Sequence, residues 1–122
     1  MREAANIAVA VVALLHVYFL VLEMFFWTKP LGRRVFGLKP ELAQASASLA
    51  ANQGLYNGFL AAGLIWGIVL GPAGDPVKIF FLVCVLIAGI FGAVTANRKI
   101  LYVQALPAVI ALTLVLLSPA LG

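Results

Sequence analysis

Eight polar side chains in or beside the apolar segments of this sequence have the chemistry to bind a ligand or to exchange protons. They are a histidine, a glutamate, an arginine, a tyrosine and four amides: His16, Glu23, Asn52, Gln53, Tyr56, Asn57, Arg98 and Gln104. Polar groups are costly in hydrocarbon unless the protein pairs them, and ionisable groups there usually have a function. We therefore take these eight residues as the candidate site.

His16 and Glu23 are the candidates for catalysis or proton transfer. Seven residues separate them, so on a helix they share nearly the same face, about two turns apart. A histidine titrates near neutral pH, which suits proton coupling or acid–base assistance to a bound ligand. The same spacing holds the two side chains about 10 Å apart along the helix axis. Because a zinc-type site needs its ligands around a single ion, no metal site is predicted.

The other six residues are the candidate ligand-binding residues, and four of them lie between Asn52 and Asn57. At about 100° per residue, these four are predicted to share one broad helix face, which continues through three glycines: Gly63, Gly67 and Gly71. The opposite side carries a second row of small residues: Gly54, Gly58 and Ala61. Small residues at such spacing let membrane helices approach closely. We predict that this helix is central and that one glycine row packs in a homo-oligomer.

The composition indicates the elements that must position these residues. Of 122 residues, 65% are hydrophobic and only 10% are charged, which lies far from the composition of soluble domains. A soluble chain of this size has too little interior to hide so many apolar side chains. Four apolar segments are long enough to cross a hydrocarbon core of about 30 Å: residues 4–27, 49–70, 77–95 and 100–117. We predict one domain over residues 1–122, an all-α integral membrane bundle of four transmembrane helices.

The distribution of basic residues predicts the orientation of the chain in the membrane. Two of the eight basic residues, Arg2 and Lys78, fall on one side of the four segments, and six fall in the loops on the other side: Lys29, Arg33, Arg34, Lys39, Arg98 and Lys99. Cytoplasmic loops carry the excess of basic residues. We therefore predict a multi-pass protein of the inner membrane with both termini outside. Basic residues confined to loops indicate topology, so no nucleic-acid partner is expected.

This topology places most of the candidate residues near the cytoplasmic ends of their segments. Tyr56 and Asn57 lie one turn deeper, and His16 lies near the middle of the first segment. We predict a polar pocket that opens to the cytoplasm and binds or passes a small-molecule or lipidic ligand. Amide and phenol groups suit hydrogen bonding to an uncharged polar group. The sequence specifies no cofactor.

Two alternatives remain open. In the first, the chain is a membrane enzyme acting on a lipophilic substrate, with the same residues in acid–base roles. In the second, it is a structural or accessory subunit. There the amides hold helices together at about 0.6 kcal/mol each, and Glu23 pairs with a basic residue at the membrane interface: Arg33, Arg98 or Lys99.

Motifs along nearly the whole chain carry a resemblance to a known family. They are His16, Glu23-Met24-Phe25, Trp27-Thr28, Phe36-Gly37, the run from Ala51 to Leu64 that includes Asn-Gln-Gly-Leu-Tyr-Asn-Gly-Phe, Gly89 to Ala93, Arg98 to Leu101 and Gln104 to Pro107. With these motifs the chain resembles the small membrane proteins catalogued as domain of unknown function 1304. The resemblance implies an integral membrane protein with four spans and brings no established activity.

A weaker similarity in layout is to the membrane-associated eicosanoid and glutathione metabolism proteins. Asn52, Asn57 and the Arg98 to Tyr102 stretch carry it. The similarity implies four helices, an outside N-terminus, a trimer and glutathione bound at the cytoplasmic side. This chain lacks the arginine and the glutamate that are typical of the second helix in those proteins.

Overall fold

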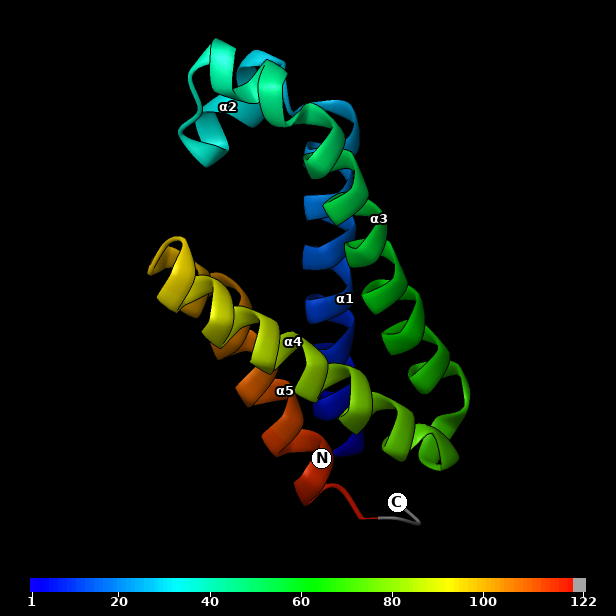
Figure 1. Ribbon diagram of the computed structural model, residues 1–122. Helices are drawn as coiled ribbons and strands as arrows, with labels where there is room; N and C mark the ends of the chain where they lie inside the picture. The colour runs from blue at the N-terminus through cyan, green and yellow to red at the C-terminus, as the bar shows by residue number, and fades with distance from the viewer. Residues whose placement is uncertain (120–122) are drawn as a thin grey trace. The chain divides into compact units, whose positions relative to one another are not determined.

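The computed structural model describes residues 1–119, and all regular structure in this range is helical (Figure 1). The elements in chain order are α1 (Arg2–Phe25), α2 (Pro30–Phe36), α3 (Pro40–Val69), the 3-10 turn η1 (Gly71–Gly74), α4 (Asp75–Thr95), the π-helical turn η2 (Leu101–Ala105) and α5 (Leu106–Leu117). The all-α prediction is therefore confirmed. The four-span arrangement and the position of the termini stay predictions.

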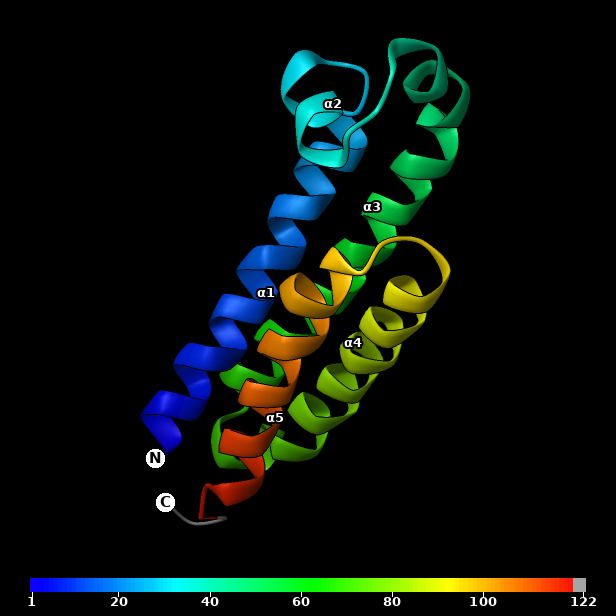
Figure 2. The ribbon, with the colours of Figure 1, turned by 90° about the vertical axis from the view of Figure 1, so that its left-hand side faces the viewer.

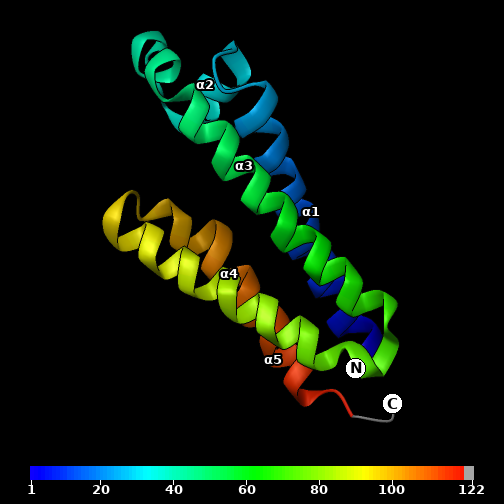
Figure 3. The same ribbon diagram turned by 45° about the vertical axis from the view of Figure 1, so that its right-hand side comes forward.

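Two of the described helical segments are long and apolar enough to cross a membrane, judged by length and composition. They are Arg2–Phe25 and Gly71–Thr95, and a shorter apolar helix covers Leu101–Leu117. The helix α3 has 30 residues and runs without interruption (Figure 3), but it does not meet the same criterion of length and apolarity. Amide side chains such as Asn52, Gln53 and Asn57 reduce its hydropathy.

The chain divides into two compact units, and α1 and α3 each contribute one end to each of them. The first unit combines Met1–Leu14 with the chain from Ala62 onward, and the second is Leu15–Ala61. Each unit is described by itself below.

In the first unit, α4 and α5 lie side by side along their lengths (Figures 1 and 2). Close approach at Gly89 makes this possible, because a Cβ atom there would stand 2.8 Å from the backbone nitrogen of Ala105. Within the same unit, a Cβ at Gly63 would meet the ring of Phe81, and one at Gly67 would meet the side chain of Lys78. Since neither glycine has a side chain, Phe81 and Lys78 of α4 can pack directly on α3 at these two positions.

The turn before α5 carries a backbone distortion beside Pro107. Since proline has no N–H, the sequence predicts a missing hydrogen bond to the Val103 carbonyl and a bend. The structure has one π-helical turn there, in which the Leu106 N–H donates to the carbonyl of Leu101, five residues back. Pro107 then occupies the first turn of α5, where no N–H is needed. The distortion is therefore a π-helical turn just before the proline.

In the second unit, α2 joins the ends of α1 and α3 (Figure 2). The sequence predicts only turns between residues 28 and 39, so this helix was missed. It begins at Pro30 and ends at Gly37, whose φ of 65° favours glycine. Gly32 packs directly on the Phe26 carbonyl, and the Trp27 indole donates to Ser46 Oγ over 3.0 Å. These contacts hold α2 on the turn that follows α1, and the same turn on α3.

The packing of α3 on α1 in this unit uses the row of small residues. A Cβ at Gly54 would stand 2.7 Å from Met24 Cγ and 3.2 Å from the Leu20 carbonyl oxygen, and one at Gly58 would meet Leu20 Cδ1 at 2.7 Å. The close approach predicted for this row therefore occurs within one chain. Its use in a homo-oligomer stays a prediction.

Candidate functional site

The second unit brings together two of the predicted site residues, Glu23 on α1 and Asn57 on α3. Asn57 Nδ2 donates a hydrogen bond to Glu23 Oε1 at a distance of 2.5 Å. Asn57 is 5% exposed and Glu23 is half-buried. Hydrogen bonds to an ionised carboxylate are shorter and stronger than those between neutral groups. The pair is therefore a close polar contact between two otherwise apolar helix faces.

The glycine at position 54 explains why these two side chains can meet. A Cβ atom there would stand 3.2 Å from Glu23 Cβ, so a larger residue would push the helices apart. Gly54 precedes Asn57 by three residues and therefore lies on a neighbouring part of the same helix face. The absent side chain brings α3 close enough for a short asparagine to reach the carboxylate.

Glu23 makes no ion pair within the second unit. The two salt bridges between residues 1 and 119 both involve Asp75, with Arg2 and with Lys78. One alternative interpretation of the sequence paired Glu23 with Arg33, Arg98 or Lys99. Within the second unit an amide partners Glu23 in place of Arg33, and an amide does not neutralise a carboxylate. Pairing with Arg98 or Lys99, which belong to the first unit, stays a prediction.

His16 lies on α1, two turns before Glu23, and its side chain is completely buried. The imidazole ring stands edge-to-face with the ring of Phe19, with ring centroids 5.7 Å apart. A buried imidazole in an apolar helix can exchange a proton only through a hydrogen-bonded neighbour. His16 therefore remains a candidate for proton exchange two turns from the Glu23–Asn57 pair.

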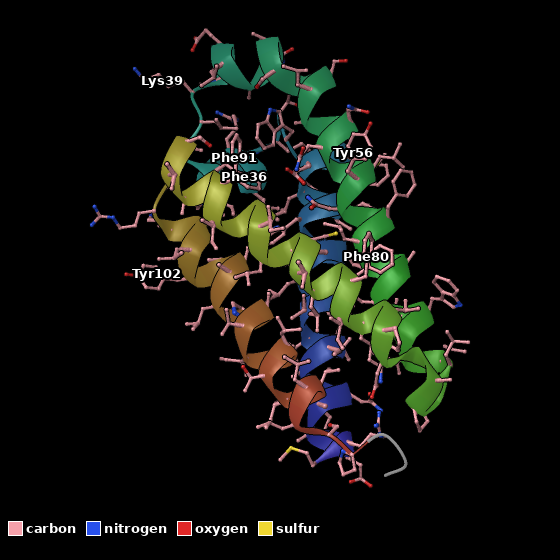
Figure 4. All side chains as sticks on the ribbon, turned by 60° about the horizontal axis from the view of Figure 1, so that its bottom comes forward. Phe36, Lys39, Tyr56, Phe80, Phe91 and Tyr102 are labelled. Carbon is pink, nitrogen blue, oxygen red and sulfur yellow. The ribbon has the colours of Figure 1, made fainter. Side chains whose placement is uncertain are left out.

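The other three predicted site residues of α3 lie on a different face of the helix from Asn57. Asn52, Gln53 and Tyr56 are exposed, and Tyr56 points away from the helices (Figure 4). The Tyr56 ring stands edge-to-face with that of Phe59, at a centroid distance of 5.8 Å. These three residues belong to one surface, as predicted from their spacing.

The prediction that Asn57 shares this surface is wrong. Asn57 is buried on the same side as Gly54 and Ala61. At about 100° per residue, a residue three positions after Gly54 and four before Ala61 is only about 60° and 40° away from them. The spacing therefore groups Asn57 with the small residues that face α1.

Arg98 and Gln104 belong to the first unit. Arg98 is exposed in the connection after α4, and Gln104 is half-buried in the π-helical turn. Their grouping with Glu23 and Asn57 in one pocket stays a prediction.

The first unit contains a polar cluster that was not predicted from the sequence. Arg2 forms two hydrogen bonds with the carboxylate of Asp75, at 2.8 and 3.0 Å, and a further one with the Pro119 carbonyl. Lys78 is 0% exposed, and its Nζ donates to Asn6 Oδ1 at 2.9 Å and to Asp75 Oδ1 at 3.2 Å. The signal in the sequence was a lysine inside an apolar segment, three residues after an acid.

Between residues 1 and 119, no three His, Cys, Asp or Glu side chains gather in a group that could hold a metal ion. The single cysteine, Cys84, is half-buried on α4 and free. The chemistry available at the candidate site is therefore that of a carboxylate, an amide and an imidazole.

Comparisons with known proteins agree with the sequence motifs. The model of a family described as a protein of unknown function (DUF1304) matches residues 10–116. An uncharacterized protein, YpaA of Lactococcus lactis subsp. lactis (strain IL1403), is 35% identical over 103 residues. The alignment covers 83% of this chain and 87% of that relative. No solved structure gives a significant match.

Proposed function

The chain belongs to the protein family of unknown function DUF1304, and we propose that it is a multi-pass membrane protein that binds or passes a small molecule at the Glu23–Asn57 pair. The ligand class that suits this pair best is a small molecule carrying a positive charge or N–H donors. The cytoplasmic side of the protein, in this proposal, is the side of the basic loops.

The distribution of apolar surface supports the membrane location. Only 28% and 22% of the residues in the apolar windows of the two membrane-crossing candidates are buried. Large side chains such as Ile7, Trp66 and Phe91 are more than half exposed. Soluble monomers rarely expose extended apolar surfaces, so lipid is the solvent that suits these helices. The helix α3, at about 45 Å, is long enough to cross the membrane. Its amide side chains would then lie in the membrane as well.

The single observation that carries the proposal is the short hydrogen bond from Asn57 to Glu23. A carboxylate on an apolar helix, without a cationic partner in its own unit, is costly to maintain for structure alone. An amide donor satisfies one lone pair and leaves the negative charge uncompensated. A cationic or N–H-donating ligand would supply the missing compensation.

The chemistry of the pair also allows proton coupling. The ionised Glu23 carboxylate accepts from the Asn57 N–H. A protonated Glu23 carries an O–H, and rotation of the Asn57 amide presents a carbonyl oxygen that accepts from it. The pair therefore stays hydrogen-bonded in both protonation states, and binding of a cation would favour the ionised one. His16 lies two turns away as a second group able to exchange a proton.

The experiment is a ligand-dependent stability measurement on the purified full chain in detergent. The probes are ammonium, guanidinium and tetramethylammonium salts, with neutral glycerol and urea derivatives for comparison. Ligands that bind only the folded state raise its stability by mass action. We expect stabilisation by at least one cationic probe, lost in Glu23→Gln and Asn57→Ala and kept in Asn52→Ala. Equal stabilisation of all four proteins, or of none, contradicts the proposed site.

A further inference from the structure

A second polar feature lies on α2 and the turn that follows it, within the second unit. Five residues line an open surface pocket of about 360 Å³: Pro30, Arg33, Arg34, Gly37 and Leu38. The proposed ligand site on α1 and α3 does not use any of them. Two of the five are arginines in the last turn of a seven-residue helix, so the pocket presents two guanidinium groups together.

Basic residues are concentrated in the segment that carries this pocket. Four basic residues lie between residues 28 and 40, and the nearest acids in the sequence are Glu23 before them and Glu41 after them. Arg34 and Lys39 are exposed, and Lys39 extends away from the helices (Figure 4). A concentrated positive field of this kind attracts anions to the surface.

One donor in the pocket lacks a hydrogen-bond partner. Arg33 Nε is buried and donates to no group in the described part of the chain. A buried N–H without an acceptor costs about 1–3 kcal/mol, so an oxyanion that reached it would remove this cost. Arginine presents its donors as a planar fork, which suits two oxygens of one phosphate group.

The backbone around the pocket is held in place by close packing. A Cβ at Gly32 would stand 2.0 Å from the Phe26 carbonyl oxygen, so α2 lies directly on the turn that leaves α1. The rings of Trp27 and Phe36 pack at a centroid distance of 4.9 Å. The N–H groups of Gly37 and Leu38 both donate to the Arg33 carbonyl. These contacts therefore fix the backbone positions from which the two arginine side chains extend.

The same short helix exposes apolar side chains. Leu31 and Val35, four residues apart on one helix face, are 44% and 46% exposed. A helix with basic residues and an exposed apolar row has the composition of segments that lie in the membrane interface. There the basic groups reach the lipid phosphates and the apolar groups enter the acyl boundary.

We propose that this pocket binds the phosphate of an anionic phospholipid headgroup in the cytoplasmic leaflet. The proposal rests on the membrane location in the proposed function, and it is independent of the Glu23–Asn57 ligand site. The Arg33 and Arg34 guanidinium groups hold the phosphate oxygens, with Lys39 adding to the positive field. Leu31 and Val35 contact the acyl region beside the headgroup.

The experiment measures lipid binding by native mass spectrometry of the full chain in detergent. The probes are phosphatidylglycerol, phosphatidylcholine and inorganic phosphate. The test variants are Arg33→Gln, Arg34→Gln and Arg33→Lys. The last variant keeps the positive charge but removes the planar guanidinium group. Lys99→Gln is the matched control, because it removes an exposed basic residue from the other unit and lies outside the eight candidate site residues. The melting temperature of each variant serves as the check on folding.

We expect phosphatidylglycerol to bind more tightly than phosphatidylcholine and to lose roughly tenfold in affinity in the two Arg→Gln variants. Arg33→Lys loses an intermediate amount, and Lys99→Gln stays within about twofold of wild type, as expected for a distant surface charge. Unchanged phosphatidylglycerol affinity in well-folded Arg33→Gln overturns the proposal. Equal competition by inorganic phosphate also overturns it, because the site would then bind a free anion.

Two readouts distinguish failure of the headgroup site from failure of the proposed function. If carbonate washing extracts the chain from membranes, the membrane location is wrong and both proposals fail. If the chain stays in the membrane and Arg33→Gln binds phosphatidylglycerol like wild type, only the headgroup site is wrong. The Glu23-dependent stabilisation by cations tests the ligand site separately.

Discussion

Asn57 on α3 donates its side-chain amide to the Glu23 carboxylate on α1 over 2.5 Å, although the two residues lie 34 positions apart in the sequence. Asn57 is almost fully buried, and Glu23 has no cationic partner within its own unit. The contact combines a helix-packing role with a half-buried carboxyl group that has no cationic partner in its own unit. Both roles can be tested by substitution.

Replacing Asn57 with alanine should destabilise the protein. The change leaves a half-buried carboxylate without its donor, and hydrogen bonds to charged groups contribute about 1.5–3 kcal/mol. We expect a loss of about 2 kcal/mol in the free energy of unfolding, measured by denaturant titration in mixed micelles. Asn52→Ala is the control, since Asn52 is exposed on the same helix. A loss in Asn52→Ala as large as in Asn57→Ala would show that the hydrogen bond contributes nothing specific.

Two glycine-to-alanine changes on α4 should differ sharply in their cost. A methyl group at Gly89 would stand 2.8 Å from the backbone nitrogen of Ala105, whereas one at Gly92 would stand 3.1 Å from a side-chain carbon of Ile100. Backbone atoms cannot move aside without shifting the helix, while an isoleucine can change rotamer. We expect Gly89→Ala to lose about 1–3 kcal/mol of stability and Gly92→Ala to lose less. Equal melting temperatures of the two variants would contradict the observed packing of α4 on the η2 turn.

The cluster around Lys78 predicts a non-additive pair of substitutions. Asp75→Asn removes the carboxylate beside a lysine whose side chain is only 1% exposed. Breaking a buried pair from one side leaves an uncompensated charge, which costs about 3–5 kcal/mol, and less here because Asp75 keeps some exposure. We expect Asp75→Asn to lose about 2–3 kcal/mol in the free energy of unfolding.

The double variant Asp75→Asn/Lys78→Met completes this test. Methionine removes the buried charge and keeps much of the volume, so the double variant should lose less than the sum of the two single losses. Glu3→Gln, a change at an exposed acid on α1, is the control and should leave stability within about 0.5 kcal/mol of wild type. Strict additivity would mean that the Asp75–Lys78 contact carries no coupling energy.

The predicted topology can be tested with single cysteines. Cys84 is the one native cysteine, so Cys84→Ser provides the background. Lys39→Cys lies in a predicted cytoplasmic loop and Ala73→Cys in a predicted outside turn, and both positions are exposed. With a membrane-impermeant maleimide on intact cells, we expect labelling of Ala73→Cys alone and labelling of both after permeabilisation. Labelling of Lys39→Cys on intact cells would show that the orientation is opposite to the predicted one.

Some features of the chain are local and could be predicted from the sequence. The start of α3 at Pro40 follows from the proline and glutamate in its first turn. The distortion near Pro107 follows from the missing N–H. The helix α2 was missed because seven residues with Pro, Gly and two arginines show no periodic pattern. Its position is set by packing contacts of Gly32 with Phe26 and of Phe36 with Trp27.

The sequence by itself determined that the chain is helical and apolar and that polar groups gather near the start of α3, because these properties depend on composition and short-range spacing. Only the tertiary structure decided which of those groups is buried. Asn57 pairs with Glu23 because Gly54 lets α3 approach α1, and Lys78 meets Asn6 across 72 positions. Such pairs depend on how helices pack, and helix packing is set by contacts between residues far apart in the sequence.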